Sequence, residues 1–112
     1  MVAAEAGAER FTVWGVDLSP GTGSEQAGYR PVLVVSPDAM NRNLRTVIVA
    51  PMTTRLRHWP SRVKIRHAGK TGEVALDQLR TLDQTRLARP MGRLAERYQG
   101  EVLAILAEMF AE

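Results

Sequence analysis

The stretch GSEQAGYRPVLVVS, residues 23 to 36, places one cation, Arg30, where a polar loop becomes an almost wholly apolar strand. A positive charge at the start of a buried strand does not stabilise the strand unless a negative group binds there. A guanidinium presents its N–H donors in a fixed plane that suits phosphate. The position therefore indicates an anion-binding site, although an arginine before a strand can also pair with a carboxylate for purely structural reasons.

The charge distribution favours a polyanion as the ligand. Fourteen Arg and Lys residues stand against five Asp and Glu residues between positions 26 and 100, whereas the two ends together hold one basic and seven acidic residues. Thirteen of the fifteen cations are arginines. Such a basic region is typical of proteins that bind nucleic acid. We predict salt-sensitive contacts with the nucleic-acid backbone from Arg55, Arg57, Arg62, Lys64 and Arg80.

Other chemistries do not fit the composition or the spacing. The chain has no cysteine, which excludes disulfides and thiolate metal sites. His58 and His67 are nine positions apart without an H-E-x-x-H motif, so we predict no metal site and expect both to be surface loop residues. The loop GTGSEQAG has Gln26 where G-x-G-x-x-G requires its third glycine, and it leads into a strand. Nothing in the sequence calls for a cofactor.

Short apolar segments predict the strands that would position these residues. They are a β-branched and aromatic strand at 11–18, two continuous apolar strands at 30–36 and 46–52, and an alternating strand at 62–66 whose exposed face is basic. The sequence HAGKTG predicts a hairpin leading into the strand EVALDQL at 73–79. Residues 80–90 are predicted to form short strand and turn material ending at Pro90 and Gly92.

The period of the apolar residues changes near the C-terminus. From Leu94 onward they fall at helical spacing and predict one amphipathic helix, in which Gly100 costs about 1 kcal/mol relative to alanine. Asp38 and Asn41 indicate a turn or a single helical turn after Pro37. We expect a disordered tail at 1–10 and one domain at 11–112, mainly β with a C-terminal helix (α+β), forming a small antiparallel barrel or a strongly curved sheet.

Nothing in the sequence directs the chain to a membrane or out of the cell. The N-terminus lacks the basic and apolar regions of a signal peptide. The longest apolar run, VLAILA at 102–107, is too short to span a bilayer. A cytoplasmic location is consistent with these features and with the absence of cysteine.

Three blocks of sequence resemble the MazF/PemK family of toxin endoribonucleases. They are V-W-x-V-D-L-x-P-x-x-G-S-E-Q-x-G-x-R-P-V-L-V-V-S at 13–36, T-V-I-V-A-P-M-T at 46–53 and D-Q-L-R-T-L-D at 77–83. The resemblance covers nearly all of the chain from residue 11 and implies an SH3-like barrel of the CcdB/PemK type. It also implies a metal-independent, often sequence-specific RNase acting as a homodimer and neutralised by a cognate MazE-like antitoxin. The chain departs from the family at Arg10-Phe11-Thr12, where the usual pattern is Arg-Gly-Asp.

The resemblance implies that Arg30 and Thr53 are the catalytic pair and that Glu25 also takes part. RNA carries its own nucleophile, because a 2'-hydroxyl can attack the adjacent phosphate to give a 2',3'-cyclic phosphate and a 5'-hydroxyl. Arg30 would neutralise the charge that develops, and the unactivated hydroxyl of Thr53 would hydrogen-bond the phosphate. Glu25 is suited to accept the 2'-proton, but it could instead orient Arg30 or contact a base. The choice of Thr53 over Thr54 rests on alignment alone.

Further residues are candidates for contacts with single-stranded RNA. Trp59, in a basic loop, could stack on an exposed base or cover one end of the barrel, whereas Trp14 is expected in the core. Gln78 lies in a matched motif and could contact RNA or stabilise a loop or the dimer. Thr54 is also a candidate RNA contact, because it follows Thr53 directly in the chain. The apolar C-terminal helix, with Met109 and Phe110 near its end, is a candidate dimer surface.

Two other functions fit a barrel of this kind. A CcdB-like toxin binds DNA gyrase and cleaves nothing, but members of that family end in Trp-Gly-Ile, whereas this chain ends in Met-Phe-Ala-Glu. A non-catalytic RNA-binding barrel would use the same basic face.

Overall fold

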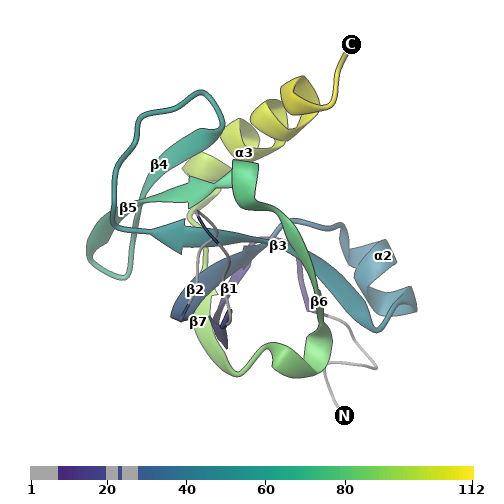
Figure 1. Ribbon diagram of the computed structural model, residues 1–112. Helices are drawn as coiled ribbons and strands as arrows, with labels where there is room; N and C mark the ends of the chain where they lie inside the picture. The colour runs from purple at the N-terminus through teal and green to yellow at the C-terminus, as the bar shows by residue number, and fades with distance from the viewer. Residues whose placement is uncertain (1–7, 20–22, 24–27) are drawn as a thin grey trace.

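The computed structural model describes residues 8–19, 23 and 28–112 (Figure 1). Its elements are almost all strands, joined by short turns, with one longer helix at the C-terminal end. They are β1 (Thr12–Asp17), β2 (Tyr29–Val34), α2 (Asp38–Asn43), β3 (Thr46–Thr53), β4 (Arg62–His67), β5 (Lys70–Ala75), η1 (Leu76–Gln78), β6 (Arg80–Asp83), η2 (Gln84–Arg86), β7 (Arg89–Arg93) and α3 (Glu96–Met109).

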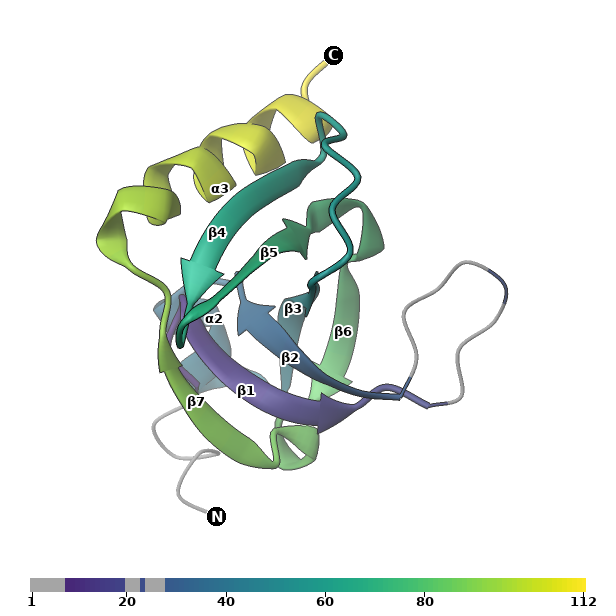
Figure 2. The same cartoon turned by 90° about the vertical axis from the view of Figure 1, so that its left-hand side faces the viewer.

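The strands of the described residues form one antiparallel sheet that curls into a half-barrel. Its order is β4-β5-β3-β2-β1-β7, with β6 paired to β3 off this path. The eight residues of β3 allow it to pair with β6 through its first half, with β2 through its middle and with β5 at its end. Helix α3 lies along β4 on the outside (Figure 2). The prediction of a small, mainly β barrel with a C-terminal helix is confirmed.

Strands β2 and β3 are buried on both faces. Leu33, Ala50 and Met52 belong to a core cluster that continues under α3 through Val102. The alternate residues of the same two strands belong to a second cluster on the opposite face, which also contains Leu82 of β6. Burial on both sides explains why these two segments read as continuous apolar runs rather than as alternating ones.

Strand β7 corrects one prediction. It runs from Arg89 to Arg93, through Pro90 and Gly92, where the sequence indicated an end. In the described part of the chain β7 pairs only with β1, so it is an edge strand, and an edge strand tolerates proline because one side needs no N–H donor. Gly92 has a φ of +89°, and the register against β1 shifts between Thr12 and Trp14.

The domain also begins earlier than residue 11. Ala8 is buried, its N–H donates to Gln84 Oε1 at 3.0 Å, and its carbonyl accepts from Asn41 Nδ2 at 2.7 Å. Residues 8 to 10 are thus tied to the barrel and are not a disordered tail. The rest of the predicted tail, residues 1–7, lies outside the described residues. No helix in the described part of the chain has the length and apolar character needed to cross a membrane.

Phe11 occupies the position where the resembled family has glycine, and its backbone has a φ of +71°. Non-glycine residues adopt this left-handed region at a cost. Two contacts offset that cost here: the N–H of Phe11 donates to the carbonyl of Val34 at 2.7 Å, and the ring is buried in the core. The departure from the family pattern therefore leaves the start of β1 intact.

Candidate active site

A cavity of about 380 Å³ lies where the ends of β2 and β3 meet the β4–β5 hairpin and β7. Its lining contains cationic, hydroxyl-bearing and apolar side chains, and none of the described lining residues carries a carboxylate. The lining residues are Tyr29, Arg30, Pro31, Met52, Thr53, Thr54, Ile65, His67, Ala68, Lys70, Thr71, Gly72 and Met91. The cavity thus brings together Arg30 with both candidate threonines, and its charge favours an anionic ligand.

The strand register explains why Arg30 and Thr53 line the same cavity. Strands β2 and β3 are antiparallel, with Val32 opposite Pro51 and Leu33 opposite Ala50. If this register is extended by two residues toward the start of β2, Arg30 falls opposite Thr53 at the end of β3. Arg30 is half-buried and lines the cavity, so its side chain does not point into the hydrophobic core.

Thr53 is 7% exposed and its hydroxyl is already oriented. Its Oγ1 accepts a hydrogen bond from the N–H of Arg55 at 3.1 Å. A hydroxyl has one proton and two acceptor sites, so a Thr53 hydroxyl that accepts from the backbone retains its proton for a ligand oxygen. Thr54 is exposed and lines the same cavity.

His67 reaches this cavity, which corrects the prediction of a surface loop residue. It is the last residue of β4, is half-buried, and pairs with Lys70 across the tight turn at Ala68 and Gly69. Its Nε2 lies 2.6 Å from the carbonyl oxygen of Met91. A carbonyl only accepts hydrogen bonds, so Nε2 carries a proton. The hairpin in HAGKTG was the one sequence signal that placed this histidine at a strand end.

His58, in contrast, is an exposed loop residue as predicted, with a side chain 67% exposed. Its N–H and that of Arg57 donate to the two carboxylate oxygens of Glu73, at 2.9 and 3.0 Å. Glu73 is 1% exposed and lies 3.4 Å from the guanidinium of Arg62. Burial alone would raise the pKa of Glu73, but the two N–H donors and the Arg62 charge outweigh it and hold the pKa below its ordinary value.

Arg62 is not placed to contact a nucleic-acid backbone, contrary to the prediction. Its side chain is 4% exposed, and its Nε and Nη2 donate to the two oxygens of Asp77 at 2.6 and 3.2 Å. With Glu73 on its other side, this guanidinium neutralises two carboxylates of the protein. Asp77, whose burial opposes ionisation, nevertheless has a lowered pKa because Arg62 and Ser61 hydrogen-bond its charged form.

The other predicted RNA contacts lie outside the cavity. Arg55, Arg57 and Lys64 are exposed on the loop after β3 and on β4. Trp59, in the same loop, is 48% exposed. Gln78 and Arg80 are half-buried in η1 and at the start of β6.

Glu25 lies outside the described residues. Trp14 is half-buried against the second core cluster and donates from Nε1 to Thr12 Oγ1 at 3.0 Å. In the residues that the structure describes, no group of three or more His, Asp or Glu side chains is placed to hold a metal ion.

Known toxins of one family are similar to this chain in sequence and in fold. The family model of the PemK-like, MazF-like toxin of type II toxin-antitoxin systems matches residues 9–110. An endoribonuclease MazF of Staphylococcus saprophyticus is 38% identical over 99 residues, which cover 83% of this chain and 82% of the relative. The crystal structure of MazF from Deinococcus radiodurans has a TM-score of 0.78 at 30% identity, covering 91% of this chain and 94% of the other.

A mycobacterial endoribonuclease solved in complex with its cognate antitoxin has a TM-score of 0.77 at 27% identity, covering 90% of this chain and 92% of the other. The family match spans almost every residue that the structure describes. The chain therefore belongs to the PemK-like, MazF-like toxins of type II toxin-antitoxin systems.

Proposed function

We propose that this toxin is an endoribonuclease that cuts single-stranded mRNA in the cavity at the ends of β2 and β3. The observation that carries the proposal is the placement of Arg30 and Thr53 on adjacent strand ends in one cavity with a positive wall. Arg30 supplies the charge for a phosphodiester, and Thr53 supplies an oriented hydroxyl. The activity named for the staphylococcal relative agrees with this chemistry.

The reaction can run on groups that the RNA and the chain provide. The 2'-oxygen attacks the adjacent phosphorus, the bond from phosphorus to the 5'-oxygen breaks, and the products are a 2',3'-cyclic phosphate and a 5'-hydroxyl. Arg30 stabilises the negative charge on the non-bridging oxygens as it grows, and Thr53 donates to one of them. The 2'-proton must pass to a base and the leaving oxygen must gain a proton. Glu25 remains the sequence-based candidate for the base.

Membership of this family also suggests which partners the toxin binds. We infer a cognate MazE-like antitoxin whose acidic, partly disordered segment competes with RNA for the basic surface. We also infer a homodimer, to which the exposed apolar residues Leu103 and Met109 of α3 and Phe110, which follows the helix, are suited. The location that follows from an mRNA substrate is the cytoplasm.

One incubation distinguishes the ribonuclease from the two alternatives. Purified protein is mixed with a long single-stranded RNA in EDTA, and the RNA is resolved on a denaturing and on a native gel. Cleavage is the expected result. Retardation without cleavage would instead support a non-catalytic RNA-binding barrel, and the absence of both would return the gyrase-binding toxin to consideration.

A further inference from the structure

The loop at 54–61, between β3 and β4, is fixed to the barrel by a charge network in which Glu73 and Arg62 are buried and Asp77 lies at the surface. Two consecutive N–H groups of the loop, from Arg57 and His58, donate to the carboxylate of Glu73. At the far end of the loop, the hydroxyl of Ser61 donates to Asp77 at 2.9 Å. The guanidinium of Arg62 joins the two carboxylates from within the protein. The loop is thus held at its middle and at its far end by hydrogen bonds that form without a ligand.

Trp59 contacts this network through Arg62, and its ring is held although nearly half of the residue is exposed. The guanidinium carbon of Arg62 lies 4.7 Å from the ring centroid, within the range of a cation–π contact. The backbone also fixes the residue, because the N–H of Arg62 donates to the carbonyl of Trp59 at 3.0 Å. Since the Arg62 side chain is buried, it supports the ring from the protein side, while 48% of Trp59 stays exposed.

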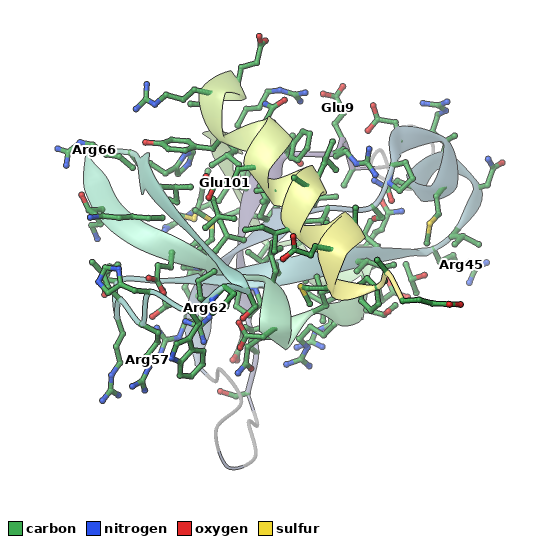
Figure 3. The ribbon with its side chains drawn as sticks, turned by 90° about the horizontal axis from the view of Figure 1, so that it is seen from above. Glu9, Arg45, Arg57, Arg62, Arg66 and Glu101 are labelled. Atoms are coloured by element: carbon green, nitrogen blue, oxygen red, sulfur yellow. The ribbon has the colours of Figure 1, made fainter. Side chains whose placement is uncertain are left out.

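The surroundings of Trp59 match an unpaired nucleotide. Arg57, whose guanidinium carbon lies 5.5 Å from the ring centroid, is exposed and reaches outward, whereas Arg62 lies close to the sheet (Figure 3). Two further cations are exposed: Arg55 lies in the same loop as Trp59, and Lys64 lies on β4. An exposed aromatic ring beside exposed cations is the combination with which proteins bind single strands, by stacking on a base and neutralising its phosphate.

The anchor of the loop is adjacent to the candidate catalytic residue. Glu73 of β5 lies directly opposite Thr53 of β3 in the strand register. The loop starts at Thr54, which itself lines the cavity, and returns at Trp59 to the network built on Glu73. A base stacked on Trp59 therefore belongs to a nucleotide close to the phosphate that Arg30 and Thr53 would bind.

We propose that Trp59 is a preorganised stacking platform for one unpaired base flanking the cut, and that Glu73, Arg62 and Asp77 are positioning residues that act through it. This inference rests on the proposed function, because it concerns the substrate of the same site. It makes the charge network of Glu73, Arg62 and Asp77 part of RNA recognition, although none of the three touches RNA.

The first test uses an RNA that contains a mapped cut site with 2'-deoxyribose at the cut position, so that it binds without being cleaved. We expect Trp59→Ala to weaken its binding about 5- to 150-fold, the range for loss of one base stack, and Trp59→Phe to weaken it less. The matched control is Leu44→Ala. Leu44 is an apolar residue of similar exposure, at 46%, but it lies directly after α2 and outside the loop at 54–61. Leu44→Ala should bind as the unchanged chain does.

Tryptophan fluorescence reports the stack directly, because Trp14 and Trp59 are the two tryptophans of the chain. The deoxy-substituted RNA should quench the fluorescence of the unchanged protein, and most of this quenching should vanish in Trp59→Phe, where Trp14 remains. If the unchanged protein cuts and binds RNA while Trp59→Ala binds equally well and Trp59→Phe is quenched equally, the platform is refuted and the ribonuclease stands. If the unchanged protein neither cuts nor binds RNA, the proposed function itself fails.

The positioning role is tested by a double-mutant cycle with Arg62→Lys, which retains the charge that Glu73 and Asp77 require. We expect Arg62→Lys to weaken binding of the deoxy-substituted RNA at least 3-fold when Trp59 is present, and not at all in the Trp59→Ala background. An equal loss in both backgrounds would mean that Arg62 acts on RNA binding by a general structural route and would overturn this part of the proposal. Thermal melting of all four proteins verifies that each is folded.

Discussion

Gly72 approaches Thr53 so closely that a Cβ atom on Gly72 would lie 2.6 Å from the carbonyl oxygen of Thr53. Side-chain carbons do not tolerate such a distance to backbone, so the end of β3 keeps its place only because residue 72 has no side chain. Both residues line the candidate cavity. The position of the Thr53 hydroxyl thus depends on a glycine in the neighbouring strand.

The substitution Gly72→Ala should displace Thr53 and reduce cleavage at least 10-fold, because small misplacements of a reacting group are costly. The measurement is kcat/KM on a short RNA with one mapped cut site. Gly100→Ala is the control: a Cβ there meets no atom within 4 Å, and the change should stabilise α3 by about 1 kcal/mol without altering cleavage. Full activity of a folded Gly72→Ala protein would contradict the role assigned to this contact.

The direct test of the site is removal of its charge and its hydroxyl. Arg30→Ala should lower kcat by about 10²- to 10³-fold, the usual effect of losing one donor to developing charge. Arg30→Lys should retain only part of the activity, because a lysine lacks the planar set of donors. Thr53→Ala should also reduce kcat strongly. The barrel should remain folded by circular dichroism. Undiminished cleavage by both alanine variants would remove the proposed site.

The chemistry of the RNA ends distinguishes attack by the 2'-oxygen from hydrolysis by water. We expect fragments with a 2',3'-cyclic phosphate and a 5'-hydroxyl, detected by mass spectrometry and by labelling of the 5'-ends with polynucleotide kinase without prior dephosphorylation. An RNA with 2'-deoxyribose at the cut position should survive intact. Fragments with 5'-phosphate ends would show that another nucleophile attacks.

Local sequence patterns were sufficient for much of the barrel. The runs at 30–36 and 46–52 predicted buried strands because β2 and β3 have a core on each face, and HAGKTG predicted the hairpin because its turn residues adopt positive φ values. The choice of Arg30 and Thr53 as the candidate catalytic pair came from the family resemblance, and both residues line one cavity. A local pattern shows which residues share a face of a strand, and a family match places the strands in order.

Local patterns could not predict which distant segments pack over the outer face of a strand. The alternation in RVKIR correctly placed Arg62 on the outer face of β4, but the loop at 54–61 folds over that face and turns an expected phosphate contact into a buried partner of Asp77 and Glu73. His67 was missed for a related reason. Its route into the cavity depends on β7, a strand that begins more than twenty residues later and whose carbonyl at Met91 holds the ring.

Acid should weaken the network around Glu73. The pKa values of Glu73 and Asp77 are lowered by folding, so their contribution to stability is complete above the pKa values of the unfolded chain, near 4. It is then lost as the pH falls through the lower folded values. We expect Glu73→Gln to lower the free energy of unfolding at pH 7 by about 3 kcal/mol, as breaking a buried pair does, and the gap to the unchanged protein to narrow at pH 3.

Urea unfolding at the two pH values measures this difference. Glu9→Gln is a suitable control, because the Glu9 to Arg93 pair is exposed at both ends and should contribute little at either pH. A gap for Glu73→Gln that stays constant between pH 7 and pH 3 would show that the charge of Glu73 is not what holds the loop.

Phe11 allows backbone strain and core packing to be compared at one position. Phe11→Gly would relieve the positive φ of +71°, which costs on the order of 1 kcal/mol for a residue with a Cβ. It would also remove a buried aromatic ring, and such losses cost about 3 to 5 kcal/mol. Packing should win, so we expect Phe11→Gly to be less stable by about 2 to 4 kcal/mol in urea unfolding. A glycine variant as stable as the unchanged chain would mean that the ring contributes little and that residue 11 retains only the backbone role of the family glycine.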